Sequence, residues 1–281
     1  QTEDGWTYPS VDVSIDGRVA NIMMRGPDSA PERSADTWSL RAFRELEDAL
    51  LHLRVNHLEV GLINLRTSGD AAQVLAHEAF ILEGCQTDWF LMEVKHFQAQ
   101  CLRRLDNMAK SVFAIIEPGH CFVGILFELT LAGDRSYMLL DEDLENTIEL
   151  SQANAGAFTM ANGLSRLQSR FPGDPDAPGN ALAEDGPIDA ETAEDLGIVT
   201  AAPDDIDWDD EVRIAIEERI SLSPDALTGM EQNLRFGGTE TCETKIYGRL
   251  SAWQNWIFQR PNAVGKTGAL TLYGHPERPV F

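Results

Sequence analysis

The stretch from 111 to 140, SVFAIIEPGHCFVGILFELTLAGDRSYMLL, contains residues that could stabilise negative charge on an oxygen atom. Its apolar run 112–116 is rich in branched side chains, which is typical of a strand covered on both faces. Pro118 and Gly119 end this run, because proline cannot donate a ladder hydrogen bond and glycine tolerates turn dihedrals. A helix predicted from 124 to 131 would point backbone N–H groups and its positive end at one place. A developing oxyanion could be held there.

Glu128 is the carboxylate of this predicted helix. Leu126, Leu129 and Thr130 share roughly one helical face, and Glu128 lies next to it. The sequence therefore predicts an acidic side chain close to the core. The next strand is predicted at 136–140.

Two other groupings invite a chemical interpretation. His120 and Cys121 are adjacent, which suggests a thiolate nucleophile, but neighbours in an extended segment point in opposite directions. We therefore favour a buried structural cysteine beside a polar neighbour. The remaining histidines (His52, His57, His77, His96 and His275) show no metal-ligand spacing, and we predict no metal site.

Cationic and aromatic residues also cluster in places. Lys95, Arg103, Arg104 and Lys110 form the best local basic patch, which phosphate groups of a ligand would need. We favour the alternative that this patch is a solvated helix face. Trp253 and Trp256 could line an aryl pocket, although residues at helical spacing more often pack in a core or a subunit interface.

The composition limits the possible partners and compartments. The 281 residues carry a formal charge of −24, which repels nucleic acids and anionic membranes. The four cysteines lie far apart without a CxxC motif, so we expect reduced thiols in a cytoplasmic protein. No apolar run approaches the length of a membrane span, and we see no signal peptide. The chain begins with Gln1, so we expect either a processed start or a piece of a longer protein.

The order of the predicted elements indicates an α/β fold with mostly parallel strands, because parallel strands need crossover helices. After an arm at 1–10, the first half is predicted to contain a hairpin (11–24) turning at Asp16-Gly17, a helix (36–54), a strand (60–65), a loop (66–70) and two helices (71–108) that separate near 84–87. The second half is predicted to contain an exposed loop (171–187), a helix (188–196), a strand (198–201), a helix (212–220), a helix opened by Ser223-Pro224, an aromatic stripe (250–257) and a tail from 261.

Three segments resemble the crotonase (enoyl-CoA hydratase/isomerase) superfamily over about residues 11–220. They are AIIEPGHCFVGILFELTLAGDRSYM, NGLSRL and DAETAEDLGIVTA. Two longer segments, SLSPDALTGMEQNLRF and GRLSAWQNWIFQRPNAVG, are similar to the second half of the benzoyl-CoA-dihydrodiol lyase family. The resemblance implies a crotonase-like domain at 1–220 and a C-terminal helical segment at 221–281. It also implies a carbon–carbon lyase that opens the oxidised ring of a benzoyl-CoA derivative and releases formate.

The resemblance assigns roles to particular residues. Crotonases hold a thioester carbonyl between two backbone N–H groups. Gly124 and Ile125 stand at the Gly-rich turn, with Ile125 as the donor, and the second donor is expected in the loop 66–70. Glu128 matches the first catalytic carboxylate, whereas the second falls on Gln152, which cannot transfer a proton. The CoA thioester is the substrate, and no cofactor is implied.

These departures from the family pattern leave two interpretations of Glu128. It could be a general acid/base whose pKa is raised by burial. We favour the other interpretation, in which Arg135 or Arg166 neutralises Glu128 in a vestigial pocket. This portion would then contribute architecture, either as a homo-oligomer or docked to an N-terminal crotonase-like half. The alternatives are a self-sufficient acyl-CoA hydratase or isomerase that uses Glu128, and a non-catalytic scaffold that oligomerises through 253–258.

Overall fold

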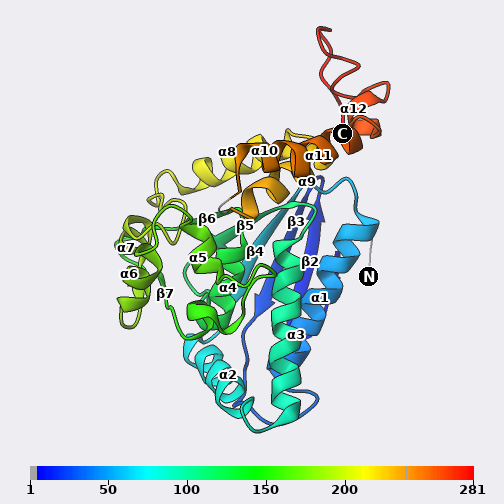
Figure 1. The fold of residues 1–281 in the computed structure, drawn as a ribbon. Helices are drawn as coiled ribbons and strands as arrows, with labels where there is room; N and C mark the ends of the chain where they lie inside the picture. The colour runs from blue at the N-terminus through cyan, green and yellow to red at the C-terminus, as the bar shows by residue number, and fades with distance from the viewer. Residues whose placement is uncertain (1–4, 238–239) are drawn as a thin grey trace.

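The computed structural model describes residues 5–237 and 240–281, and its centre is a six-stranded sheet with strand order β1 to β6 (Figure 1). Strands β3 to β6 run parallel, and β1 to β3 pair antiparallel. The strands are β1 (Gly5–Thr7), β2 (Val11–Asp16), β3 (Val19–Arg25), β4 (Leu62–Ser68), β5 (Ser111–Ile116) and β6 (Arg135–Met138). The predicted α/β architecture with mostly parallel pairing is confirmed.

The N-terminal part of the sheet differs from the prediction in detail. The hairpin forms as expected, but Asp16 pairs with Val19, so the two loop residues are Gly17 and Arg18 rather than Asp16 and Gly17. Gly17 has a φ of 55°, which glycine adopts without the penalty of a side chain. The predicted arm at 1–10 is wrong for Gly5–Thr7, which adds an edge strand to β2. The first four residues of that arm lie outside the described part of the chain.

Helices of the first half cover one face of the sheet. They are α1 (Trp38–Asn56), α2 (Ala71–Gly84), α3 (Trp89–Asp106) and α4 (Gly124–Ala132), close to the predicted ranges. The break predicted at 84–87 is confirmed, because α2 ends at Gly84 and Asp88 caps the start of α3. In α1, the predicted stripe consists of Leu40, Phe43, Leu46, Leu50 and Leu53. The last four are fully buried in the main core, as the helical spacing indicates, whereas Leu40 is partly buried against a separate apolar cluster formed mainly by α2 and α3.

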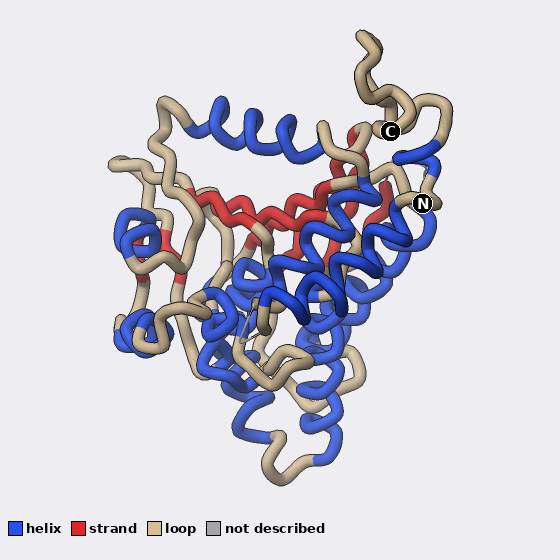
Figure 2. The backbone as a smooth tube through the Cα atoms, turned by 45° about the horizontal axis from the view of Figure 1, so that its top comes forward, coloured by secondary structure: helices blue, strands red, loops and turns tan. Residues whose placement is uncertain are grey.

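One helix lies on the opposite face. In Figure 2 a single helix lies above the strands and most of the other helices lie below them. It is α8 (Trp208–Ile220), whose Trp208, Val212 and Ala215 pack against Leu62 and Phe113 of the sheet in a second apolar cluster. Strands β4 and β5 are therefore buried on both faces, as the apolar run 112–116 predicts.

The connecting region between β6 and α8 holds short elements. They are β7 (Thr147–Ile148), η1 (Ala153–Ala157), α5 (Arg166–Arg170), α6 (Ala177–Ala183), β8 (Ile188–Asp189) and α7 (Ala190–Asp195). The loop predicted at 171–187 is wrong where α6 forms. The strand predicted at 198–201 is wrong as well, because Ala201 makes an isolated bridge to Tyr137 and no ladder continues from it.

The C-terminal segment consists of α9 (Pro224–Arg235), α10 (Cys242–Thr244), η2 (Lys245–Leu250), α11 (Ser251–Ile257) and α12 (Pro261–Val264). Ser223 caps α9 by accepting a hydrogen bond from the Ala226 N–H at 2.9 Å, as predicted. Residues beyond α12 extend from the body (Figure 1). The division into two domains at 220 stays a prediction. Among the residues described, no helix combines the length and apolarity that a membrane crossing requires.

Candidate functional site

The corner between β5 and α4 forms where the sequence predicts it. After the turn at Gly119, which has a φ of 89°, the chain reaches Gly124 with a φ of 49°. Val123 precedes α4 without a capping side chain, so the first N–H groups of the helix need other partners. The Gly124 N–H donates to the Glu149 carbonyl at 2.9 Å. The next N–H, of Ile125, is the group assigned to the oxyanion.

A carboxylate of the same chain already binds this donor. The Ile125 N–H donates to Glu78 Oε2 at 2.6 Å, and the Ser151 hydroxyl donates to Glu78 Oε1 at 2.6 Å. Glu78 lies on α2 and is 6% exposed. Burial raises its pKa, while the hydrogen bonds from Ser151 and Ile125 oppose the rise. The acceptor position that an oxyanion would take is therefore occupied by Glu78.

Gly124 is what allows Glu78 to come this close. A Cβ at residue 124 would lie 2.2 Å from Glu78 Oε2, and the φ of 49° is one that other residues rarely adopt. Glu78 is not among the residues predicted from the sequence. The available signal was its position between Val74 and Ile81, at helical spacing on the buried stripe of α2.

The loop expected to supply the second oxyanion donor is engaged with its neighbours. Thr67 Oγ1 accepts from the Cys121 N–H at 3.0 Å, and the Gly69 N–H donates to the Gly119 carbonyl at 3.4 Å. Asp70 caps α2. Part of the predicted loop, up to Ser68, belongs to β4. The two loops therefore bind each other rather than leaving a pair of free donors.

Glu128 lies in a sealed ion-pair network rather than in a cleft. It is 1% exposed, its Oε2 accepts from Arg166 Nη1 at 2.7 Å, and its Oε1 accepts from Asn154 Nδ2 at 2.9 Å. Burial raises the pKa of Glu128, and Arg166 opposes that rise. Of the two predicted partners, Arg166 is confirmed and Arg135 is wrong, because Arg135 donates to the Tyr137 hydroxyl instead.

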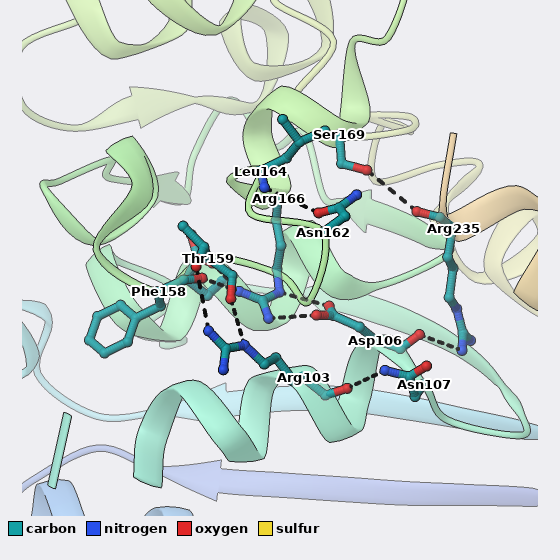
Figure 3. A network of polar contacts seen from close by, with 11 residues as sticks. Arg103, Asp106, Asn107, Phe158, Thr159, Asn162, Leu164, Arg166, Ser169 and Arg235 are labelled. Atoms are coloured by element: carbon teal, nitrogen blue, oxygen red, sulfur yellow. Dashed lines mark hydrogen bonds and ion pairs between the residues drawn. The ribbon is translucent and has the colours of Figure 1, made fainter. Parts of the chain in front are cut away.

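Arg166 joins Glu128 to a second buried carboxylate. Its guanidinium donates to both oxygens of Asp106, at 2.8 Å and 2.7 Å, and to the Phe158 carbonyl at 2.8 Å (Figure 3). Arg166 is itself 1% exposed. A guanidinium bound to two carboxylates and a carbonyl in this way fixes the position of Glu128. Proton transfer by Glu128 would require this network to break.

The position expected for the second carboxylate carries no acid. Gln152 is exposed, precedes η1, and its side chain makes no hydrogen bond to the described residues. Gly124, Ile125 and Glu128 thus lie together on α4, whereas the Gln152 side chain is exposed to solvent. Glu78 is the second acid at the corner, and it serves as a hydrogen-bond acceptor for the helix.

The other sequence candidates occupy separate places. Burial raises the pKa of Cys121 to about 11 and lowers that of His120 to about 4, and His120 Nδ1 accepts from the Phe122 N–H. A thiolate–imidazolium pair therefore does not form, as predicted. Within the described ranges, no three metal-ligating side chains come together.

The predicted basic patch is wrong as a single surface. Arg103 binds the Thr159 carbonyl (Figure 3), Arg104 binds Glu47, and Lys110 is buried with its ammonium on the carbonyls of His57 and Val60. The preferred alternative of a solvated helix face is wrong for Lys110. Trp253 and Trp256 form an edge-to-face pair on α11, and both line a cavity of about 620 Å³ that Lys110 also lines.

Comparisons with known proteins complete these observations. No protein-family model matches the chain. The chain is 49% identical over 291 residues to benzoyl-CoA-dihydrodiol lyase of Aromatoleum evansii, and the match covers 99% of this chain and 52% of that protein. The chain therefore spans about half the length of this curated relative. The resemblance to that lyase is confirmed as sequence similarity.

Solved structures show the fold. An enoyl-CoA hydratase of Geobacillus kaustophilus superposes with a TM-score of 0.70 at 16% identity, covering 99% of this chain and 98% of that one. DspI of Pseudomonas aeruginosa also reaches a TM-score of 0.70, at 15% identity, with complete coverage of both chains. The fold is crotonase-like, as the sequence resemblance implies.

Proposed function

We propose that this chain is a portion of a benzoyl-CoA-dihydrodiol lyase that contributes architecture rather than chemistry. The lyase as a whole would open the oxidised, non-aromatic ring of a benzoyl-CoA dihydrodiol or epoxide and release formate. The observation that carries the family assignment is the 49% identity along 99% of the chain. The architectural role is supported by the occupied Ile125 N–H and by the sealed Glu128.

The chemistry explains why these two contacts matter. A crotonase-type step stabilises charge on a thioester oxygen with preorganised donors, which have to be free to meet that oxygen. Here Glu78 would have to leave the Ile125 N–H before a thioester oxygen could accept from it. If the Glu78 carboxylate stayed beside this donor, it would repel the negative charge that develops on that oxygen. Glu128 would have to leave Arg166, and its carboxylate would then be buried without a counter-ion. Both changes cost free energy before any substrate is bound.

The direct test is an assay for formate release by the purified chain with benzoyl-CoA dihydrodiol as substrate. We expect no formate above the blank for the wild-type chain, for Glu128→Gln, or for the control Glu83→Gln, which changes an exposed acid of α2. Substantial turnover by the wild type that Glu128→Gln abolishes and Glu83→Gln preserves would contradict the proposal. That result would favour the alternative of a self-sufficient acyl-CoA enzyme.

One observation favours association as part of this role. Among the described residues, ten of the nineteen exposed large apolar side chains lie at or after Leu222, including Tyr247 and Phe258. Apolar surface concentrated in one segment is typical of an interface. We propose that the C-terminal segment packs against another crotonase-like half or a second copy of the chain, in a cytoplasmic enzyme.

Light scattering tests this part of the proposal. Tyr247→Glu combined with Phe258→Glu should lower the measured mass, whereas Trp89→Glu, at an exposed aromatic residue on α3, should leave it unchanged. A wild-type chain that remains monomeric at all concentrations would exclude self-association. Docking to the other half would then be tested by mixing the two halves. Substitutions are preferable to removal of 224–281, because that deletion would remove Arg235 and leave its partner Asp134 without a counter-ion.

A further inference from the structure

A cavity of about 380 Å³ lies away from the corner at Gly124. It is lined by residues from the C-terminal end of α4, the start of β6, α5 and α9. The corner is at the first residue of α4 and the cavity is at its last, so the length of the nine-residue helix, roughly 13 Å, separates them. The cavity is therefore a separate place from the thioester site that the resemblance implies.

The cavity concentrates positive charge in a chain whose net charge is −24. Its lining includes five arginines and three carboxylates. Three of the arginines pair with those carboxylates, namely Arg166 with Asp106, Arg235 with Asp134 and Arg219 with Glu231, and Arg166 also pairs with the buried Glu128. Figure 3 shows two of these arginines, Arg166 and Arg235, on either side of Asp106. The remaining arginines, Arg135 and Arg170, form no ion pair with a described residue.

A guanidinium has five N–H donors, but only one of those of Arg170 has an acceptor among the described residues. Its Nε donates to the Gly197 carbonyl at 2.5 Å, and neither terminal nitrogen has a partner among the described residues. Burial lowers the pKa of Arg170 to about 10, which reflects the cost of holding the charge without a counter-ion. Neither terminal nitrogen is fully buried, so both are accessible to a ligand.

Arg135 also has N–H donors without an acceptor among the described residues. One terminal nitrogen donates to the Tyr137 hydroxyl at 3.3 Å. This hydrogen bond and, to a smaller extent, the charges of Glu218 and Glu231 raise the pKa of Arg135, although neither carboxylate forms an ion pair with it. The Ser169 hydroxyl, which lines the same cavity, donates to the Arg235 carbonyl at 3.4 Å (Figure 3). Two guanidinium groups with spare donors thus line one cavity.

We propose that this cavity is a binding site for a phosphate-type dianion held by Arg135 and Arg170. The planar fork of a guanidinium matches the oxygens of a phosphate and can bind two of them at once. Together, Arg135 and Arg170 offer more N–H donors than the two oxygens of a carboxylate can accept, whereas a phosphate has additional oxygens and a second negative charge to engage them. The overall negative field repels anions, so recognition has to come from these local contacts.

Calorimetric titration of the full chain with inorganic phosphate, at constant ionic strength set with chloride, tests the site. Arg135→Gln and Arg170→Gln should each weaken phosphate binding by roughly tenfold or more, because each removes charge-assisted hydrogen bonds. Arg213→Gln is the matched control, since it removes the same charge from an exposed arginine on α8. Acetate should bind more weakly than phosphate, and pyrophosphate at least as tightly as phosphate.

A second readout covers the case in which Arg170→Gln fails to fold. Phosphate should raise the melting temperature of the wild type and of Arg213→Gln, and this rise should be lost in Arg135→Gln, whose side chain is half-exposed. The proposal is overturned if phosphate produces neither heat nor a shift in the wild type. It is also overturned if Arg213→Gln weakens binding as much as Arg135→Gln, which would indicate a response to net charge alone.

Discussion

Glu78 Oε2 accepts the Ile125 N–H at 2.6 Å and sits where a Cβ on Gly124 would be 2.2 Å away. The carboxylate from α2 therefore takes the place that the first turn of α4 would otherwise offer to a ligand. The contact also satisfies a helix N–H that has no capping side chain.

Removing Glu78 should destabilise the fold. In Glu78→Ala the buried Ile125 N–H and the Ser151 hydroxyl both lose their acceptor, which should lower the free energy of unfolding by about 1–3 kcal/mol. Urea denaturation gives this value. The exposed neighbour Glu83→Ala should change it by less than about 0.5 kcal/mol. An equal loss in both variants would show that the contact has no special weight.

Gly124→Ala should be costly for two reasons, which a control can separate. Alanine at a φ of 49° is strained, and its Cβ collides with Glu78. Gly119→Ala, at a φ of 89° with no atom within 4 Å of the new Cβ, measures backbone strain alone, about 1 kcal/mol. Gly124→Ala should lose more, and adding Glu78→Ala should recover part of the excess. Additive losses in the double variant would contradict the collision.

Arg166→Met should be among the most damaging substitutions in the chain. It leaves the carboxylates of Asp106 and Glu128 buried without a counter-ion, which costs about 3–5 kcal/mol. The measurement is the free energy of unfolding at pH 7. Arg213→Met, which breaks two exposed pairs on α8, should cost less than about 1 kcal/mol. A wild-type-like Arg166→Met would mean that the network does not hold α5 to α4.

Glu231 should make stability depend on pH. Burial raises its pKa from 4.5 to about 7, so the folded chain binds this proton more tightly than the unfolded chain. The stabilisation is complete below pH 4.5 and is lost as the pH rises through about 7, a change of at most about 3 kcal/mol. Glu231→Gln cannot titrate, so its stability relative to the wild type should improve by up to this amount between pH 4.5 and 8. A constant difference would contradict the prediction.

Thiol reactivity should distinguish the four cysteines. Cys85, Cys101 and Cys121 are buried and Cys242 is exposed, and burial raises the pKa of both Cys101 and Cys121. We expect one fast-reacting thiol per native chain with a disulfide reagent and four in denaturant. Cys242→Ser should abolish the fast reaction. A second fast thiol in the native protein would show that the loop around Cys121 opens.

The sequence predicts the layers well, because apolar periodicity and turn residues decide them locally. The stripe of α1, the break between α2 and α3, and the run 112–116 all follow from neighbours in the chain. The short β1 and the missing strand at 198–201 were not predictable in this way. Whether three residues pair with a sheet depends on what lies beside them in space.

In the candidate site, too, contacts between residues close in the sequence could be predicted, whereas contacts between distant segments could not. Gly124, Ile125 and Glu128 are near one another in the chain, so a motif can place them together. Glu78 reaches the corner from 47 positions away, and its selection depends on the packing of α2 against α4. The choice between Arg135 and Arg166 as the partner of Glu128 was also open in the sequence. In the structure Ser165 caps α5, and Arg166, the first residue of that helix, is buried with its guanidinium on Glu128.

The hydrogen bonds between α9 and the start of β5 have a consequence for folding during synthesis. Ser111, the first residue of β5, bonds to Glu231 across 120 positions, and Arg235 reaches the carbonyl of Lys110 across 125. As the ribosome extends the chain from its N-terminus, the central strand is finished on one side long before these partners exist. β5 therefore has to wait until about 120 more residues have been synthesised, and during that interval its unpaired groups would be a natural target for chaperones.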